Sequence, residues 1–165
     1  MSRTLRRQIG KPVEVIGLIS DTHGLVRAQA LDALRGVDLI IHAGDIGKPE
    51  VLDALKHIAL LTVIKGNNDR GPWATRLPET KTVAIGAARL FLIHDVNDLA
   101  YDPSKRGISV VISGHSHKPS IVERDGVLFV NPGSAGPRRF KLPVTVGRLR
   151  IVDGKAKAEI VELRL

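Results

Sequence analysis

The chain has 165 residues, a formal net charge of +8 and no cysteine. Without cysteine there are no disulfides, thiolate metal sites or cysteine nucleophiles, so any metal must be held by oxygen atoms and imidazole nitrogens. The basic residues are scattered along the chain and aromatic residues make up only 3% of it. This composition disfavours a nucleic-acid partner, although the positive charge would suit an anionic phosphate substrate.

The length predicts one domain with a buried core. Residues 1–12 are polar and basic, so we expect a flexible basic arm followed by a single domain at 13–165. No apolar run is long enough to span a bilayer. The short apolar segment after the arm contains Glu14, unlike the uninterrupted core of a signal peptide. We therefore expect a cytoplasmic protein with no membrane partner.

The first part of the chain predicts strands that alternate with turns and helices. Apolar runs predict strands at 13–20, 37–43 and 60–65. A helix is predicted at 25–35 from its apolar periodicity, and another begins at Pro49 and ends near residue 57. Successive strand–turn–helix units favour a mainly parallel sheet with right-handed crossovers.

The second part predicts hairpins. Strands at 81–86 and 89–94 pair through a Gly-Ala-Ala turn, and a short or irregular helix is expected at 97–105 because it contains Pro103. A buried strand follows at 108–112. Asp-Gly dipeptides, which are strong hairpin signals, join the last two pairs of strands: 120–124 with 127–130, and 144–152 with 155–163.

Side chains able to bind a metal follow five of the predicted strands. Ligands in open α/β sheets collect beyond the carboxyl ends of the strands, so these groups can meet in space although they are scattered in sequence. In the last of them, His-x-His, the two imidazoles share a side of the extended chain. The candidate ligands are Asp21, His23, Asp45, Asn67, His94, His115 and His117.

Seven donors are too many for one metal that must also leave room for a substrate, and they suit two metals sharing a carboxylate. Mixed nitrogen and oxygen donors favour Mn, Fe, Zn, Ni or Co over Mg or Ca alone. Two metals roughly 3.5–4 Å apart can produce a hydroxide and clamp a phosphoryl group. Taken singly, Asp21 and His23 also fit a helix cap, and Asn67 and Asp69 also fit a turn. His42, inside an apolar strand, is predicted to be a buried structural group and not a ligand.

Taken together, Asp21-x-His23, Gly44-Asp45, Gly66-Asn67-x-Asp69, His94 and Gly114-His115-x-His117 resemble the calcineurin-like metallophosphoesterases in order and context. The short chain and its Asn131-Pro132-Gly133-Ser134 turn make it similar to the small YfcE-type phosphodiesterase branch, to which the retromer subunit Vps29 is related. The resemblance covers residues 13–163.

The resemblance implies a four-layer α/β/β/α sandwich of two facing mixed β-sheets flanked by helices. It implies two divalent metal ions, with Mn favoured and Ni, Co, Fe, Zn or Mg as alternatives. The first would be held by Asp21, His23 and His117, the second by Asn67, His94 and His115, and Asp45 would bridge them.

The implied activity is metal-dependent hydrolysis of a small phosphodiester by a metal-bridging hydroxide. The alternative is a Vps29-like protein-binding scaffold with little or no catalysis. Relatives of this size often self-associate, so the resemblance also favours a homodimer.

The chain departs from the family pattern at two places. Larger members have histidine where this chain has Asn68, and an amide cannot give a proton to a leaving group. We therefore predict slow turnover of alkyl monoesters, and we assign Asn68, Asp45 and Asp69 as catalytic residues. His94 is followed by Asp95, which could orient a ligand or cap the next helix. The role of Trp73 stays open between a subunit contact and packing on a substrate ring, and the roles of Arg138 and Arg139 between phosphate contact and a solvated loop.

Overall fold

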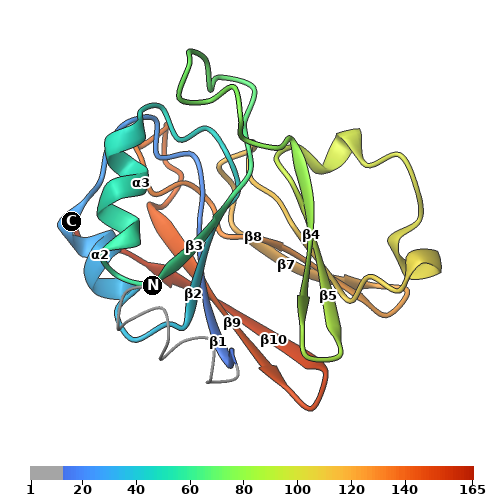
Figure 1. Cartoon of the computed structure of the whole chain (residues 1–165). Helices are drawn as coiled ribbons and strands as arrows, with labels where there is room; N and C mark the ends of the chain where they lie inside the picture. The colour runs from blue at the N-terminus through green and yellow to red at the C-terminus, as the bar shows by residue number, and fades with distance from the viewer. Residues whose placement is uncertain (1–12) are drawn as a thin grey trace, which may run out of the picture.

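Two five-stranded β-sheets face each other in the computed structural model, which describes residues 13–165 (Figure 1). The first sheet has the order β10-β9-β1-β2-β3 and the second has the order β4-β5-β6-β8-β7. The first sheet contains β1 (Val15–Ile19), β2 (Leu39–His42), β3 (Leu60–Val63), β9 (Thr145–Val152) and β10 (Lys155–Glu162). The second contains β4 (Thr80–Ile85), β5 (Ala88–Ile93), β6 (Val110–Ile112), β7 (Ser120–Arg124) and β8 (Val127–Asn131).

Each sheet is mixed, as predicted. β1, β2 and β3 pair parallel to one another, whereas β9 pairs antiparallel with both β1 and β10, so the first sheet is parallel only in its β1–β3 half. In the second sheet β5, β6 and β8 run parallel, with β4 and β7 antiparallel at the two edges. The carboxyl ends of β1, β2 and β3, and of β5 and β6, are therefore the places from which loops can converge on one site.

The central strands are buried on both faces because their apolar residues run without interruption. In β2, Leu39 and Ile41 pack between the sheets, whereas Ile40 points to the helices on the outside. This is the alternation of an extended chain. Two short helices cover that outer face, α2 (Ala28–Ala33) and α3 (Pro49–Lys56). Full burial of each Leu or Ile side chain contributes roughly 1.5–3 kcal/mol.

The outer face of the second sheet differs in detail from the prediction. In place of the one short or irregular helix expected at 97–105, the segment forms two 3-10 helices, η1 (Val96–Asp98) and η2 (Pro103–Arg106). The side chains of Asp95 and Asp102 each cap one of these short turns. Pro103 cannot continue a helix from the preceding turn, which explains the break. This layer still buries an apolar cluster that includes Phe91 and Val111.

The hairpin predictions are confirmed. Asp125-Gly126 joins β7 to β8, and Asp153-Gly154 joins β9 to β10, with positive φ angles of 51° and 76° in the first pair and 51° and 75° in the second. Such angles are those of a type I′ turn. The helix predicted at 25–35 is shorter, covering Ala28–Ala33. No helix within residues 13–165 is long and apolar enough to cross a bilayer. The predicted arm at 1–12 lies outside the described residues.

Candidate metal centre

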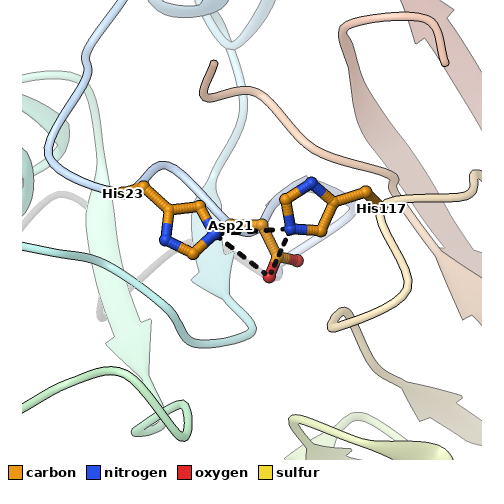
Figure 2. A group of neighbouring side chains, drawn as sticks. All are labelled: Asp21, His23 and His117. Atoms are coloured by element: carbon orange, nitrogen blue, oxygen red, sulfur yellow. Dashed lines mark hydrogen bonds and ion pairs between the residues drawn. The ribbon is translucent and has the colours of Figure 1, made fainter. Parts of the chain in front are cut away.

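The loops at the carboxyl ends of the strands bring the predicted ligands together in two groups. Asp21, His23 and His117 form the first group, which Figure 2 shows. Within each group every residue offers one ligand atom, and these atoms lie within 4.8 Å of one another. Residues that are up to 96 positions apart in the sequence thus meet in one small volume, because the strand ends of both sheets face it. The second group consists of Asp45, His94 and His115.

Asp21 is fully buried and its two carboxylate oxygens have different surroundings. Oδ2 accepts hydrogen bonds from the Ser20 hydroxyl at 2.7 Å and from the His115 amide at 3.0 Å. Oδ1 has no hydrogen-bond partner and lies 3.4 Å from Nε2 of His117 and 3.9 Å from Nε2 of His94. A buried carboxylate oxygen surrounded by imidazole nitrogens, and not by N–H donors, is the arrangement expected of a metal ligand.

His94 shows the same division between its ring nitrogens. Nδ1 is 2.7 Å from the Ala43 carbonyl oxygen, so it carries the hydrogen and donates to it. Nε2 is buried without a hydrogen bond. The backbone contact therefore fixes the tautomer and aims the Nε2 lone pair into the site, as in many metal-binding histidines.

The Oδ2 atom of Asp45 lies beside both groups. It is 3.3 Å from Nε2 of His94 and 3.9 Å from Nε2 of His23. Asn68 holds this carboxylate from the side, with its backbone amide on Oδ1 at 2.9 Å and its side-chain amide on Oδ2 at 3.0 Å. One carboxylate is thus placed where it could serve two cations.

Asn67 reaches the second group through its Oδ1, which lies 3.2 Å from Nδ1 of His115. The other ring nitrogen of His115 is 3.5 Å from Oδ2 of Asp95. Asp95 has both of the roles considered above, because its Oδ1 also accepts the Asn97 amide and caps η1. Asn67 and His115 are exposed, so this side of the centre is open to solvent.

Five of the seven candidate ligands have a left-handed backbone, which is uncommon for residues other than glycine. Each such residue costs roughly 1–2 kcal/mol. Strain of this kind concentrates at functional sites, where the surrounding fold holds it in place. The residues and their φ angles are Asp21 (54°), His23 (47°), Asp45 (56°), His115 (69°) and His117 (62°).

Two glycines allow the loops to approach this closely. A Cβ atom on Gly114 would overlap the Ser20 hydroxyl and Oδ2 of Asp21. One on Gly66 would overlap the backbone and the carboxylate of Asp45. These motif glycines are needed for contact between the loops and not for turning the chain.

His42 connects the loop after β1 to the loop after β2. Its Nδ1 accepts the Gly44 amide at 3.1 Å, so Nε2 carries the hydrogen and donates to the Thr22 hydroxyl at 3.0 Å. Thr22 in turn donates to the Ile46 carbonyl at 2.9 Å. Burial lowers the pKa of His42 to about 3, so the ring is neutral. The prediction that His42 is a buried structural group is confirmed.

Asp69 is buried, and backbone amides, not the candidate ligands, contact its carboxylate. Its Oδ1 accepts the Gly47 amide at 3.0 Å and its Oδ2 accepts the Gly66 amide at 2.9 Å. Both oxygens are therefore occupied by backbone amides of the loops after β2 and β3. The sequence assigns Asp69 as catalytic. In the structure, Asp69 holds two loops in position.

Several positioning residues were not predicted from the sequence. Asn131 donates from Nδ2 to the Gly114 carbonyl at 2.9 Å, and Ser134 donates to the Asp21 carbonyl at 3.0 Å. The Asn-Pro-Gly-Ser turn to which both belong, a break in the chain that also resembles the family, is the sequence signal that points to them. Trp73 packs against the apolar cluster between the helices and the first sheet, a placement not expected from the sequence.

The electrostatics show that this donor set favours a positive charge. Burial raises the pKa of Asp21. Burial also acts to raise the pKa of Asp45, but the His94 imidazole 3.3 Å away and hydrogen bonds from Asn68 outweigh it and hold that pKa well below its usual range. For His94, burial acts to lower the pKa, yet Asp45, the Ala43 carbonyl and Asp21 together raise it to about 9.

Two observations test whether divalent metals fit this centre. Buried atoms without a hydrogen-bond partner, Oδ1 of Asp21 and Nε2 of His94, point into it. The donor set of imidazoles, carboxylates and one amide matches Mn, Fe, Zn, Ni or Co. The residues present therefore fit two candidate metal sites, each with three ligand residues, from two loops in the first group and from three in the second.

This combination of two facing mixed sheets and a centre of histidine and carboxylate ligands at the strand ends defines the metal-dependent phosphoesterases. The chain belongs to the calcineurin-like phosphoesterase superfamily, whose domain matches residues 15–154. It is 38% identical over 159 residues to a probable metallophosphoesterase of Methanothermobacter thermautotrophicus, covering 89% of this chain and 91% of that protein.

Solved structures agree with the family. A crystal structure of wild-type Vps29 from Entamoeba histolytica complexed with Zn²⁺ is 27% identical, with a TM-score of 0.69 and coverage of 91% of this chain and 99% of that one. A structure described as a novel archaeal phosphodiesterase has the same fold, at 24% identity and a TM-score of 0.71, covering 89% of this chain and 99% of that one.

Proposed function

We propose that this protein is a phosphodiesterase that hydrolyses a small phosphodiester with the help of two divalent metal ions. The observation that carries the proposal is the position of Asp45, whose Oδ2 atom lies beside an imidazole of each ligand group. The likeness to the archaeal phosphodiesterase supports the choice of a diester substrate. A scaffold that binds no metal would have no need to keep two complete ligand groups in strained backbone.

In this proposal Asp21, His23 and His117 hold one metal and Asn67, His94 and His115 hold the other, with Asp45 shared. Such a pair supplies Lewis acidity and an activated water, and it stabilises the charge that develops on phosphorus. Mn is the metal we favour. The donors also accept Zn, the ion in the Entamoeba Vps29 complex.

The protein's own groups set the preference for the leaving group. Asn68 orients Asp45 through its backbone amide, and its exposed side chain can donate a hydrogen bond to a phosphoryl oxygen. It has no proton to give to a leaving alkoxide. Turnover should therefore be fast only for substrates whose leaving group is stable as an anion. Asp69 acts from below by holding the two loops that carry Asp45 and Asn67.

Hydrolysis of bis-p-nitrophenyl phosphate tests the proposal. We expect turnover with Mn, loss of turnover after chelation, and recovery when Mn is added back. Activity on an alkyl monoester such as glycerol 2-phosphate should be lower by about tenfold or more, because its alkoxide leaving group needs a proton that Asn68 cannot give. Protein with Asp45→Asn, purified in the same way, controls for contaminating enzymes.

The Vps29-like scaffold is the competing function. An absence of metal-dependent turnover with Mn, Ni, Co and Mg would favour the scaffold over the enzyme. The cytoplasmic location and the homodimer stay predictions from the sequence and the family resemblance.

A further inference from the structure

The loop between β8 and β9 passes directly beside the first ligand group. Ser134 donates its hydroxyl hydrogen to the Asp21 carbonyl, and the Ala135 amide donates to the Ser20 carbonyl at 3.1 Å. Ser134 also pairs with Val144, where the chain returns toward β9. Both ends of the intervening segment are thus fixed next to the strand that carries Asp21.

The tip of this segment, residues 137–141 with the sequence Pro-Arg-Arg-Phe-Lys, is exposed throughout. We call it the basic loop. Phe140 is 89% exposed and has a φ angle of 54°, in a turn closed by the Leu142 amide on the Arg139 carbonyl at 3.1 Å. Water disfavours an exposed aromatic ring, and the left-handed backbone disfavours any side chain with a Cβ atom. Packing and local conformation therefore do not explain why phenylalanine occupies this position.

The basic loop also carries positive charge beside the first group. Arg138, Arg139 and Lys141 are exposed in it, and the contacts of Ser134 and Ala135 fix the start of the segment to the backbone at Ser20 and Asp21. Beneath the start of the loop, Arg27 donates from Nη2 to the Gly136 carbonyl at 3.3 Å. The Nε atom of Arg27 is buried and has no hydrogen-bond partner in residues 13–165.

The opposite side of the centre has the other sign of charge. A cavity of about 360 Å³ adjoins the second group, and its rim carries the carboxylates of Glu79, Asp95 and Asp98 against one cation, Lys65. Negative potential there repels a substrate arm that carries a further phosphate. An arm with both a phosphate and a planar ring therefore fits the side that holds the basic loop.

We propose that the basic loop is the specificity element of this enzyme and that it selects phosphodiesters in which one arm is a nucleotide. Phe140 stacks on the base, and Arg139 pairs with a phosphate of the same arm. The proposal rests on the phosphodiesterase function proposed above. Stacking on an aromatic ring is tolerant of base identity, so we expect little preference among the bases. Arginine suits the second contact because its fork of N–H donors matches phosphate oxygens.

Two esters with the same leaving group provide the test. Thymidine 5′-p-nitrophenyl phosphate and methyl p-nitrophenyl phosphate differ only in the arm that stays on phosphorus. We expect wild-type protein to prefer the thymidine ester in kcat/KM. Phe140→Ala should reduce that preference about tenfold, mainly through KM, while Phe140→Trp keeps it. Val152→Ala is the matched control, because Val152 is an apolar side chain that is 61% exposed in the β9–β10 hairpin strand.

Arg139 is tested with a third ester that carries an added 3′-phosphate on the thymidine. Arg139→Gln should abolish the advantage of the added phosphate, and Arg150→Gln, on exposed β9 surface, should keep it. A preference ratio that Phe140→Ala leaves unchanged, or that Val152→Ala reduces equally, would overturn the proposal.

Titration of adenosine 5′-monophosphate into the protein by calorimetry separates this inference from the proposed function. Weaker binding to Phe140→Ala than to wild type supports the basic loop even when neither ester is hydrolysed, whereas equal binding overturns it. If a ten-nucleotide strand bound tenfold or more tightly than adenosine 5′-monophosphate, the preferred substrate would be the end of a nucleic-acid strand and not a small diester. Dissociation of a dimer by Phe140→Ala at constant ester preference would assign the ring to a contact between two copies.

Discussion

His94 turns Nδ1 to the Ala43 carbonyl at 2.7 Å and sets Nε2 3.3 Å from Oδ2 of Asp45. The backbone contact decides which nitrogen faces the carboxylate, so the pair is organised before any ligand arrives. With its pKa raised to about 9, His94 carries a proton at neutral pH when no metal is bound. This proton lies where the ligands would hold a metal cation, so metal binding must release it.

Asp45→Asn should reduce kcat/KM for bis-p-nitrophenyl phosphate by about a thousandfold or more. The amide keeps the shape of the carboxylate but loses the charge shared between the two groups. Metal analysis should show the loss of at least one bound ion per chain. Asp32→Asn is the control, because Asp32 lies on α2, is 67% exposed and pairs with Arg35 on the surface. Full activity in Asp45→Asn would contradict the shared position.

The metal-free protein should lose stability as pH rises from 6.5 to 9. The folded-state pKa of His94 lies above its ordinary value, so its contribution is fully present below pH 6.5 and is lost as pH rises through about 9. The expected loss in the free energy of unfolding is about 2 kcal/mol. Urea denaturation in the presence of a chelator at several pH values measures it.

His94→Gln controls for this pH dependence, and its stability should be nearly constant between pH 6.5 and 9. The pKa of His42 is lowered, so its contribution is present above pH 6.5 and falls only as pH drops below that value toward 3. It therefore does not contribute to the alkaline window. A slope of the same size in wild type and His94→Gln would show that another group is responsible.

Apolar continuity and turn chemistry predicted most of the fold. The runs around Ile40 and Val111 are buried on both faces, and the Asp-Gly dipeptides at 125 and 153 form the expected turns. Between residues 97 and 105 no such strong local signal exists, and Pro103 together with two aspartate caps favours separate turns. The spacing of apolar residues could not reveal this, because short 3-10 helices that cover a sheet bury apolar side chains just as a longer helix does.

The candidate ligands could be predicted because each follows a strand, and strand ends converge. Their backbone strain could not, since nothing local at Asp21 or His115 requires a positive φ angle. The contacts of Asp69 were also out of reach, because the partners are amides of loops whose approach depends on the assembled sheet. Long-range packing thus decides which polar residues are placed as candidate metal ligands and which hold the loops in position.

Asn68→His should raise activity on an alkyl monoester such as glycerol 2-phosphate relative to bis-p-nitrophenyl phosphate, by about tenfold in the ratio of kcat/KM values. A histidine at this exposed position can give a proton to the leaving group, which the amide cannot. Asn67→His is not a suitable control because it alters a candidate ligand. Asn97→His, on η1, adds an imidazole at a position outside both ligand groups. An unchanged ratio in Asn68→His would refute the assigned role.

Thr22→Val should weaken both the fold and the metal centre. The hydroxyl of Thr22 accepts from His42 and donates to the Ile46 carbonyl, which also accepts the Gly24 amide at 2.7 Å. Valine therefore leaves the buried Nε2–H of His42 without this partner, and the expected loss is about 1–3 kcal/mol in the free energy of unfolding. Because Thr22 lies between two candidate ligands, metal affinity should also fall, by about tenfold.

Thr75→Val distinguishes this buried contact from a generic threonine effect. The hydroxyl of Thr75 also donates to a backbone carbonyl, that of Gly71 at 3.1 Å, but on an exposed loop. Its replacement should change stability by less than about 0.5 kcal/mol and leave metal affinity intact. Urea denaturation and competitive metal titration on both variants make the comparison. Unaltered metal affinity in Thr22→Val would mean that the His42 network supports the fold without positioning Asp21 and His23.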